Sequence, residues 1–197
     1  MRYVIFIPVM LMMAAFNMAV AGDKTPTMGE DGIYHYDWYH QSFLELADDV
    51  EQARDEGKLL LVKFDQKACI YCEKMALEVF SHPAIQDYLK ENYLVVQLDL
   101  FGNKDVTDID GEIFAESEIA KRWGVLFTPT IYLATGKKQG NTLPEIADAM
   151  MPGAFGKLSF LGLLKWVKEG GPQSEETFQK YLARTMPDLR AELKAAG

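Results

Sequence analysis

The sequence predicts an α/β fold, with a central mixed β-sheet flanked by helices and with N-terminal and C-terminal helical extensions. Three observations favour this fold. Apolar runs rich in β-branched and aromatic residues, typical of buried strands, alternate with stretches of helical periodicity. The only two cysteines, Cys69 and Cys72, lie where the apolar run 59–64 gives way to a helical pattern. A further run, 125–133, contains Pro129, which marks a special position because proline removes a hydrogen bond of the sheet.

The first 21 residues have the features of a secretory signal peptide. Arg2 is followed by the apolar segment 3–18, which is short for a helix that spans a bilayer, and Ala19-Val20-Ala21 forms a cleavage motif. We expect cleavage after Ala21, a soluble periplasmic protein and no stable membrane insertion; the alternative is an uncleaved membrane anchor. In an oxidising compartment, a pair of cysteines forms either a structural disulfide or a redox site.

The length of 197 residues and a hydrophobic content of 49% indicate one globular domain with extensions. The formal net charge of −9 argues against nucleic acid as a partner. We expect an aromatic extension over 22–41, a domain over 42–171 with a loop insertion at 101–114, and a helical tail over 172–197. Four aromatic residues of the extension either pack onto the domain, which we favour, or form a surface for a partner: Tyr34, Tyr36, Trp38 and Tyr39.

The elements of the domain follow from its periodicity. In order, we expect a helix at 42–57, a strand at 59–64, the helix that follows the cysteines, a break at 81–83, a second helix from Pro83, and a strand at 93–100. After the insertion, we expect a helix at 115–123, strands at 125–133 and 146–151, a helix ending near 170, and a tail at 175–196 divided by Pro187. The aspartates of the insertion lack the spacing of a calcium loop, so a hairpin or a surface loop is favoured.

The spacing of Cys69 and Cys72 points to dithiol–disulfide exchange. Unsatisfied N–H groups in the first turn of a helix favour a thiolate. Two intervening residues allow one cysteine to attack a mixed disulfide formed at the other. Half of a zinc site is the alternative, but such a site needs about four ligands, and the three histidines show no matching spacing. We therefore expect no metal and no cofactor.

Taken together, these features resemble the thioredoxin superfamily. The resemblance rests on the strand–C-I-Y-C–helix junction at 58–75, the segment from Gly124 through Thr128-Pro129, and Gly153 before the last core helix. The pattern F-x-x-x-x-C-x-Y-C-x-x-M, the loop before the Thr-Pro strand and the C-terminal Tyr-Leu tail are similar to SoxW-type periplasmic thioredoxins, which are associated with bacterial sulfur-oxidation systems.

The resemblance implies roles for individual residues. Cys69 would be the exposed nucleophile and Cys72 the shielded resolving thiol. Pro129 would be a cis-proline that places the Thr128 backbone where an extended substrate can pair with it. Together with Ile70 and Tyr71, Thr128 and Pro129 are the expected substrate-binding residues.

Two departures from the family pattern concern the same site. Thioredoxins carry a buried aspartate six residues before the first cysteine, and here this position is Lys63. We expect Lys63 to extend its amine to solvent, although a buried, charged lysine would stabilise a thiolate. Ala68 replaces a tryptophan of the family, which predicts a more open site. Lys63, Lys67 and Asp65 are the candidates for tuning the thiol pKa values.

The sequence thus favours a periplasmic thiol–disulfide oxidoreductase that reduces disulfides of exported proteins. It would itself be reduced by a membrane disulfide reductase. The main alternative is a thioredoxin-fold binding module whose Cys69–Cys72 pair stays oxidised. A third hypothesis is a metal carrier that uses both thiolates.

Overall fold

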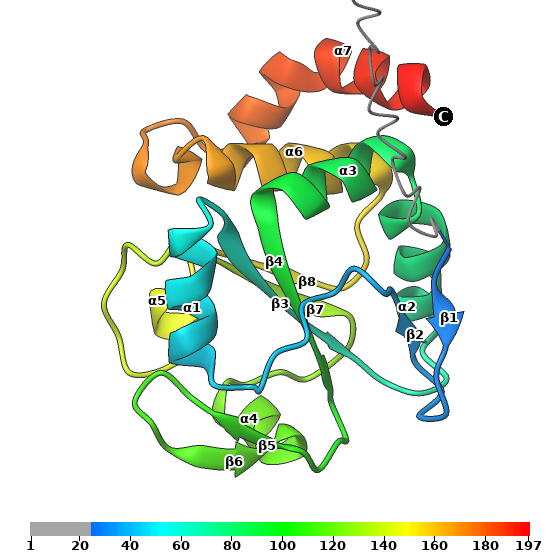
Figure 1. Cartoon of the computed structure of the whole chain (residues 1–197). Coiled ribbons are helices and arrows are strands. Elements are labelled where there is room, and N and C mark those ends of the chain that lie inside the picture. The colour runs from blue at the N-terminus through cyan, green and yellow to red at the C-terminus, as the bar shows by residue number, and fades with distance from the viewer. Residues whose placement is uncertain (1–24) are drawn as a thin grey trace, which may run out of the picture.

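The computed structural model describes residues 25–197 (Figure 1). The expected signal peptide, residues 1–21, and the cleavage position after Ala21 lie outside the described residues. Between residues 25 and 197, none of the helices has the length and apolar character needed to cross a bilayer.

A mixed four-stranded sheet forms the centre of the molecule, in the order β4-β3-β7-β8. Its strands are β3 (Leu59–Asp65), β4 (Tyr93–Asp99), β7 (Thr130–Ala134) and β8 (Ala149–Pro152). Strands β3 and β4 are parallel, β7 is antiparallel to β3, and β8 is antiparallel to β7. The α/β class with a central mixed sheet is therefore confirmed.

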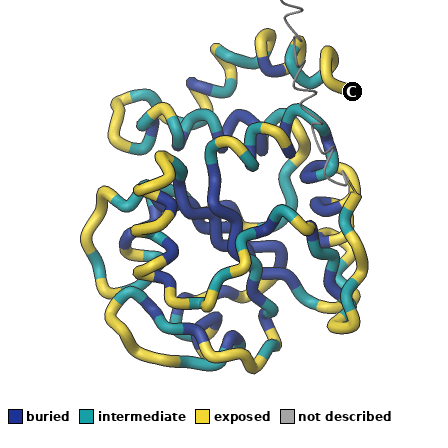
Figure 2. Tube along the Cα trace, viewed as in Figure 1, coloured by how far each residue is buried: buried dark blue, intermediate teal, exposed yellow. Residues whose placement is uncertain are grey.

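Helices cover both faces of this sheet, so its strands are the most deeply buried part of the chain (Figures 1 and 2). Because side chains alternate along a strand, Leu61 and Leu60 belong to two separate apolar clusters. The Leu61 cluster includes residues of the π-helical turn η1 (Met75–Phe80), α3 (Pro83–Asn92) and α6 (Lys157–Lys168). The Leu60 cluster includes residues of α1 (Leu46–Asp55), α4 (Glu116–Arg122) and α5 (Leu143–Ile146).

Three elements are shorter than the sequence pattern indicated. Helix α1 begins at Leu46 because the Ser42 hydroxyl accepts a hydrogen bond from the Leu44 amide (2.6 Å) and Leu44 has a φ of 62°, which forms a turn. Strand β7 begins only after Pro129, and the preceding residues 125–129 form a loop. Strand β8 begins at Ala149, since the residues just before it form α5 with a proline in its first turn.

The described part of the N-terminal extension is not helical, which corrects the expectation. It forms an antiparallel hairpin of β1 (Thr27–Met28) and β2 (Tyr34–His35), and its turn includes Gly32 with a φ of 76°. The aromatic residues that follow the hairpin pack on the domain. Tyr36 and Tyr39 are buried in the Leu61 cluster, and the Tyr36 hydroxyl donates to the Ala76 carbonyl (2.8 Å).

The insertion at 101–114 contributes a second hairpin, β5 (Asp105–Thr107) with β6 (Ile113–Ala115). Its acidic side chains surround the guanidinium of Arg122, which forms ion pairs with Asp108, Asp110 and Glu112. An arginine side chain thus lies among the carboxylates for which a calcium loop was considered.

The C-terminal tail consists of the 3₁₀ turn η2 (Gly171–Gln173) and the helix α7 (Phe178–Ala196), which packs against α6 and α3. Helix α7 continues through Pro187, so the expectation that this proline divides the helix is wrong. Pro187 and Ala183 are exposed, so the carbonyl that loses its helical partner lies on the solvent side. Gly162 of α6 allows the close approach of α7, because a Cβ there would lie 2.7 Å from Leu182.

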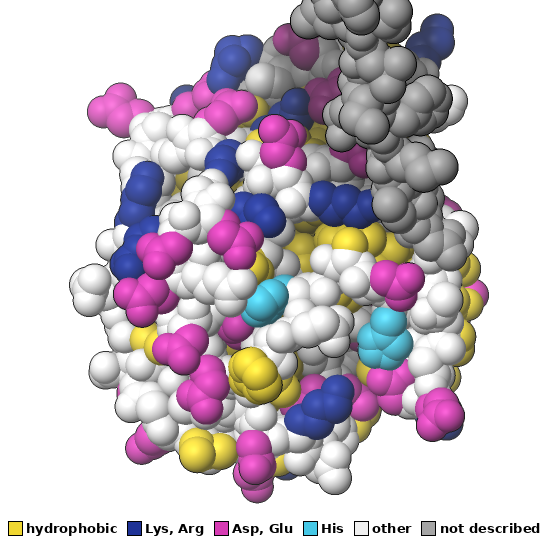
Figure 3. Space-filling view, viewed as in Figure 1, with side chains coloured by type: hydrophobic (Ala, Val, Ile, Leu, Met, Phe, Trp, Pro, Cys, Tyr) yellow, Lys and Arg dark blue, Asp and Glu magenta, His cyan; other side chains and the backbone are white. Residues whose placement is uncertain are grey.

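Acidic and basic side chains are interspersed over the face shown in Figure 3. Several form exposed or half-buried pairs, such as Arg54 with Glu51 (2.9 Å) and Lys165 with Glu192 (2.6 Å). Such pairs contribute about 0–1 kcal/mol each, so the core, rather than surface charge, stabilises the fold.

Candidate active site

The two cysteines lie at the start of helix α2 (Ile70–Lys74), directly after the loop that leaves β3. Cys69 is the N-cap residue, and its sulfur accepts a hydrogen bond from the Cys72 amide (3.0 Å). Ala68 precedes it with a φ of 57°, which turns the chain from the strand into the helix. A sulfur that accepts an amide N–H at a helix start is favoured as a thiolate when the pair is reduced.

Cys69 and Cys72 form a disulfide, with their Cα atoms 5.2 Å apart. Cys69 is partly exposed, whereas Cys72 is buried with 6% of its surface accessible. The accessible sulfur is therefore the one that a second protein can reach. The resemblance implied the same difference in exposure, and the roles of nucleophile and resolving thiol stay predictions.

The Thr128–Pro129 segment lies against the disulfide, and its peptide bond is cis. The Thr128 hydroxyl donates to the Cys69 sulfur (3.3 Å), and the Thr128 carbonyl oxygen lies 3.6 Å from the same sulfur. The sheet sets this arrangement, because Thr130 at the start of β7 pairs with Phe64 near the end of β3. The structure thus brings together both cysteines, Thr128 and Pro129, as the sequence predicted.

Exposed apolar side chains occur on the two segments that meet at the disulfide, the helix that follows Cys69 and the loop before the cis bond. Ile70 and Tyr71 are 70% and 58% exposed, and Leu126 and Phe127 before the cis bond are 84% and 52% exposed. A groove of about 390 Å³ beside the disulfide is lined by Tyr71, Lys74, Phe127, Thr128 and residues 153–156. Sequence reasoning named Ile70 and Tyr71 but missed Leu126 and Phe127. The signal for these two was their position, because they directly precede the Thr-Pro pair.

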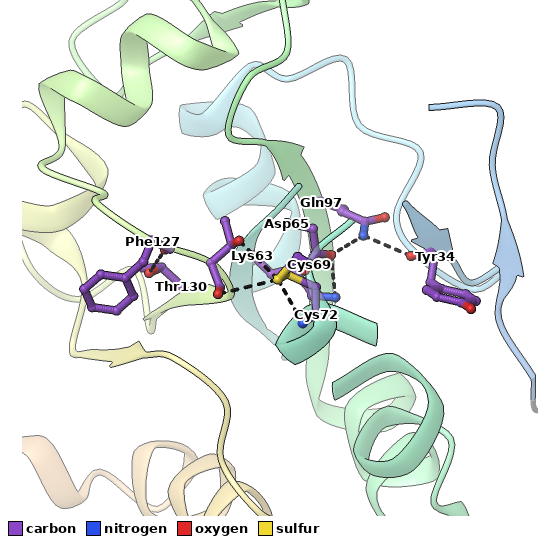
Figure 4. The surroundings of a disulfide bond; sticks show 9 residues. Tyr34, Lys63, Asp65, Cys69, Cys72, Gln97, Phe127 and Thr130 are labelled. Atoms are coloured by element: carbon purple, nitrogen blue, oxygen red, sulfur yellow. Dashed lines mark hydrogen bonds and ion pairs between the residues drawn. A yellow bond between two sulfur atoms is a disulfide. The ribbon is translucent and has the colours of Figure 1, made fainter. Parts of the chain in front are cut away.

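Lys63 is fully buried, so the expectation that it extends to solvent is wrong. Both faces of β3 are covered, which leaves its side chain no path to the surface. Its Nζ atom instead lies 2.6 Å from Asp65 Oδ2 and 4.9 Å from the centre of the Phe80 ring. Asp65 is buried as well, and its Oδ2 also accepts a hydrogen bond from the Gln97 amide nitrogen (Figure 4).

Asp65 lies beside the disulfide, since it lines a hollow of about 40 Å³ together with Cys69 and Cys72. Burial raises the pKa of the neighbouring Tyr39 hydroxyl well above its usual value, and the Asp65 carboxylate adds to this shift. Tyr39 is therefore a neutral neighbour of the Lys63–Asp65 pair at physiological pH. A buried carboxylate next to a resolving thiol can accept or return a proton during disulfide exchange.

Lys67 is exposed, and its side chain lies along the turn of the N-terminal hairpin at Gly32. Its role in tuning the thiol pKa values stays a prediction. The site beside Ala68 is less open than the replacement of tryptophan by alanine predicted. Ala68 itself is exposed, but the adjoining hollow is closed by residues of the hairpin, including Ile33. Sequence reasoning did not place the hairpin in this site.

Comparisons with known proteins are consistent with this geometry. A sequence model described as a thioredoxin-like domain matches residues 46–153, which is more than half of the chain. Among curated proteins, an uncharacterized protein of Caenorhabditis elegans is 23% identical over 168 residues. The match covers 83% of this chain but only 22% of that protein, so the chain spans less than a quarter of its relative.

Solved structures with a similar fold share little sequence with the chain. A thioredoxin-fold protein from Helicobacter pylori is 21% identical, with 71% of this chain and 84% of that chain covered and a TM-score of 0.47. A thioredoxin from Thermus thermophilus is 21% identical, with 62% and 83% covered and a TM-score of 0.48. An oxidoreductase named DsbH is 12% identical, with 76% and 95% covered and a TM-score of 0.45.

The family match is the decisive comparison. Residues 46–153 include β3, both cysteines and the Thr128–Pro129 bond, which are the parts that form the site. The chain therefore belongs to the thioredoxin-like domain family.

Proposed function

We propose that this protein is a thiol–disulfide oxidoreductase that acts on cysteines of exported proteins, and that it works as a reductase. The observation that carries the proposal is the asymmetry of the Cys69–Cys72 disulfide. One sulfur is accessible and contacts Thr128, and the other is buried one helical turn away. Such a pair is suited to form and resolve mixed disulfides.

The reaction begins with the reduced protein. The Cys69 thiolate attacks one sulfur of a substrate disulfide, which breaks that bond and releases the second substrate sulfur as a thiolate that takes up a proton. Cys72 then gives up its proton and attacks the Cys69 sulfur. This forms the Cys69–Cys72 disulfide and releases the first substrate sulfur, which is protonated in turn. Two electrons and two protons pass to the substrate, and a membrane disulfide reductase supplies the electrons for the next cycle.

The surroundings of Cys69 support a polypeptide substrate. The cis Thr128–Pro129 segment offers backbone groups for an extended chain, and Ile70, Tyr71 and Phe127 offer exposed apolar contacts. We infer that the substrate presents its disulfide on an accessible segment with apolar neighbours.

Export to the periplasm is part of the proposal and rests on the sequence. Cell fractionation and N-terminal sequencing test it, with Gly22 as the expected first residue of the mature protein. An uncleaved N-terminus in the membrane fraction would instead support the alternative, in which residues 1–21 stay on the protein as a membrane anchor. The resemblance to SoxW-type proteins stays a prediction, and so does the reductase direction.

The deciding experiment is a titration of the Cys69–Cys72 couple against a dithiol buffer, combined with an assay of insulin disulfide reduction. A potential near that of thioredoxin, about −270 mV, supports a reductase, and one near about −120 mV reverses the direction of electron flow. Cys69→Ser should abolish turnover, and Cys72→Ser should accumulate the mixed disulfide. A pair that stays oxidised throughout, with no reversible two-electron couple, would favour the binding module.

A further inference from the structure

The N-terminal hairpin forms one side of the disulfide site. Its strand β2 lies next to the end of β3 and the start of α2, and Figure 4 shows Tyr34 linked through Gln97 to Asp65. The hollow of about 40 Å³ between hairpin and disulfide is lined on one side by Met28, Gly32, Ile33 and Tyr34. On the other side it is lined by residues of β3, the cysteine loop and α2, namely Asp65, Gln66, Ala68, Cys69, Cys72 and Glu73.

Several contacts along its length hold the hairpin against the site. The Tyr34 carbonyl accepts a hydrogen bond from Gln97 Nε2 (3.1 Å), and the Tyr34 hydroxyl donates to Glu73 of α2 (3.3 Å). Just after the hairpin, the buried Tyr36 hydroxyl donates to the carbonyl of Ala76 in η1 (2.8 Å). Ile33 is 4% exposed, so it packs as a core residue.

The turn of the hairpin also fits closely on the cysteine loop. A Cβ at Gly32 would lie 2.8 Å from Cγ of Lys67, which shows how little space separates the two segments. The hairpin is thus attached to β4, to α2 and η1, and to the loop between β3 and α2. A segment fixed at these points acts as part of the domain rather than as a loose arm.

The opposite side of the disulfide is open by comparison. There the groove of about 390 Å³ is nearly ten times larger than the hollow under the hairpin, and its rim carries the exposed side chains of Tyr71 and Phe127. The two sides therefore differ in access. Both cysteines line the small hollow under the hairpin, whereas Thr128, whose hydroxyl donates to the Cys69 sulfur, lines the larger groove.

We propose that the N-terminal hairpin, residues 27–35, is a specificity-determining wall of the redox site. It covers Cys72 and limits productive attack to cysteines that an extended polypeptide presents from the Thr128 side. The inference deepens the proposed function and rests on it for the identity of the substrate. Since thiol–disulfide exchange depends on access to the attacked sulfur, a closed wall restricts reaction of Cys72 with small disulfides and thiols.

The first test measures access to Cys72 without any turnover. In a Cys69→Ser background, Cys72 is the only thiol, and its rate of reaction with the small disulfide DTNB is followed by absorbance. Adding Ile33→Ala removes the side chain that closes the hollow, and we expect the labelling rate to rise about tenfold. Equal rates of Cys72 labelling with and without Ile33→Ala would contradict the proposal that the hairpin shields Cys72.

A second variant keeps the test valid if Ile33→Ala unfolds the protein. Gly32→Ala places a methyl group against Lys67 and should also accelerate labelling of Cys72. Its matched control is Gly57→Ala, where glycine also has a positive φ but a Cβ meets no atom within 4 Å. Circular dichroism at the labelling temperature checks that each variant is folded. Equal acceleration by both substitutions would mean that general strain, not the wall, exposes Cys72.

The second test concerns substrate choice at Cys72, again in the Cys69→Ser background, because the accessible Cys69 would react with oxidised glutathione whether or not the wall is present. We expect Ile33→Ala to increase the rate at which Cys72 reacts with oxidised glutathione about tenfold, while its rate of reaction with insulin disulfides changes by less than about twofold. An equal change with both substrates would refute a role in specificity. If the wild-type protein reduces no insulin, the proposed function fails, whereas the labelling experiment still decides whether the hairpin shields Cys72.

Discussion

Asp65 and Asp108 are both buried carboxylates with a cationic neighbour, yet their surroundings differ. Asp108, in the 101–114 insertion, uses both oxygens fully. Its Oδ1 accepts from the Ile109 and Leu143 amides (2.8 and 3.1 Å), and its Oδ2 accepts from the Trp123 indole (2.8 Å) with Arg122 at 3.4 Å.

Asp65 is only half satisfied within the described protein. Its Oδ2 contacts Lys63 and Gln97, but its Oδ1 has no hydrogen-bond partner among residues 25–197, and neither has Lys63 Nζ beyond the ion pair. Almost all buried polar groups in proteins are satisfied, so an exception calls for an explanation. Asp65 lines the same hollow as Cys72. Asp108 therefore stabilises the local fold, whereas we propose that the unpaired Oδ1 of Asp65 takes part in proton transfer at the dithiol.

The largest expected effect on stability comes from Asp108→Ala. The substitution leaves the Trp123 indole and two backbone amides without their acceptor and removes one of the three carboxylates that pair with Arg122, so we expect a loss of about 4 kcal/mol in the free energy of unfolding. Urea denaturation measures it. Asp110→Asn, which weakens a more exposed ion pair of the same Arg122, should lower the free energy of unfolding much less than Asp108→Ala does. A changed reduction potential in the Asp108→Ala protein would show that Asp108 also influences the dithiol, which contradicts the distinction between Asp108 and Asp65.

A double-mutant cycle on Lys63 and Asp65 tests the role proposed for Asp65. Lys63→Met alone leaves a buried carboxylate without its cation and should cost about 3 kcal/mol, whereas the Lys63→Met/Asp65→Leu protein should regain most of that stability. The double variant should nevertheless resolve mixed disulfides on the order of a hundredfold more slowly, because Cys72 loses its proton acceptor. Stopped-flow kinetics measures this step. Recovery of stability together with an unchanged resolving rate would assign the pair a purely structural role.

A smaller effect is expected from Gln97→Leu, which removes the amide between Asp65 and the hairpin. Two hydrogen bonds, to Asp65 and to the Tyr34 carbonyl, are lost, so stability should fall by about 1 kcal/mol and the resolving rate by a few-fold. Gln52→Leu is a suitable control, because Gln52 donates to Glu56 on the exposed face of α1 (2.9 Å). If Gln97→Leu and the control have the same free energy of unfolding and resolve the mixed disulfide at the same rate, the hydrogen bonds of Gln97 do not matter for the site.

The parts of the site that are local in sequence could be predicted. Strand β3, the cysteine pair at a helix start and the Thr128–Pro129 segment each carry their signal within a few residues. The pairing of β3 with β7 then brings them together. The mixed sheet could be predicted for the same reason, because each of its strands is a short apolar run.

The parts that depend on long-range packing could not be predicted. Lys63 was expected at the surface because a lysine in a strand usually reaches solvent, but all seven residues of β3 are buried. One signal was available, since Asp65 is two residues away and therefore on the same face of the strand. The hairpin and Gln97 gave no such signal, because their contacts with the site join residues far apart in the chain.

The smallest expected effect concerns His82, a third buried polar residue, which packs near the C-terminal end of the chain away from the dithiol. Burial lowers its pKa, and the nearby Lys157 adds to this shift. The unfolded chain, with a histidine pKa of about 6.5, therefore binds more protons than the folded chain just below that pH. Stability should fall as the pH falls from about 7 toward 5, by less than about 1 kcal/mol.

Replacing His82 with Gln should reduce this loss of stability, as urea denaturation at several pH values would show. Burial shifts the pKa of Asp49 upward, which opposes the His82 effect, so the informative quantity is the difference between wild type and variant. Because His82 contacts neither cysteine nor the hairpin among the interactions of the described residues, the reduction potential should stay the same in His82→Gln. A changed potential would show that a buried polar group need not adjoin the dithiol to influence it, and would remove the distinction drawn between Asp65 and Asp108.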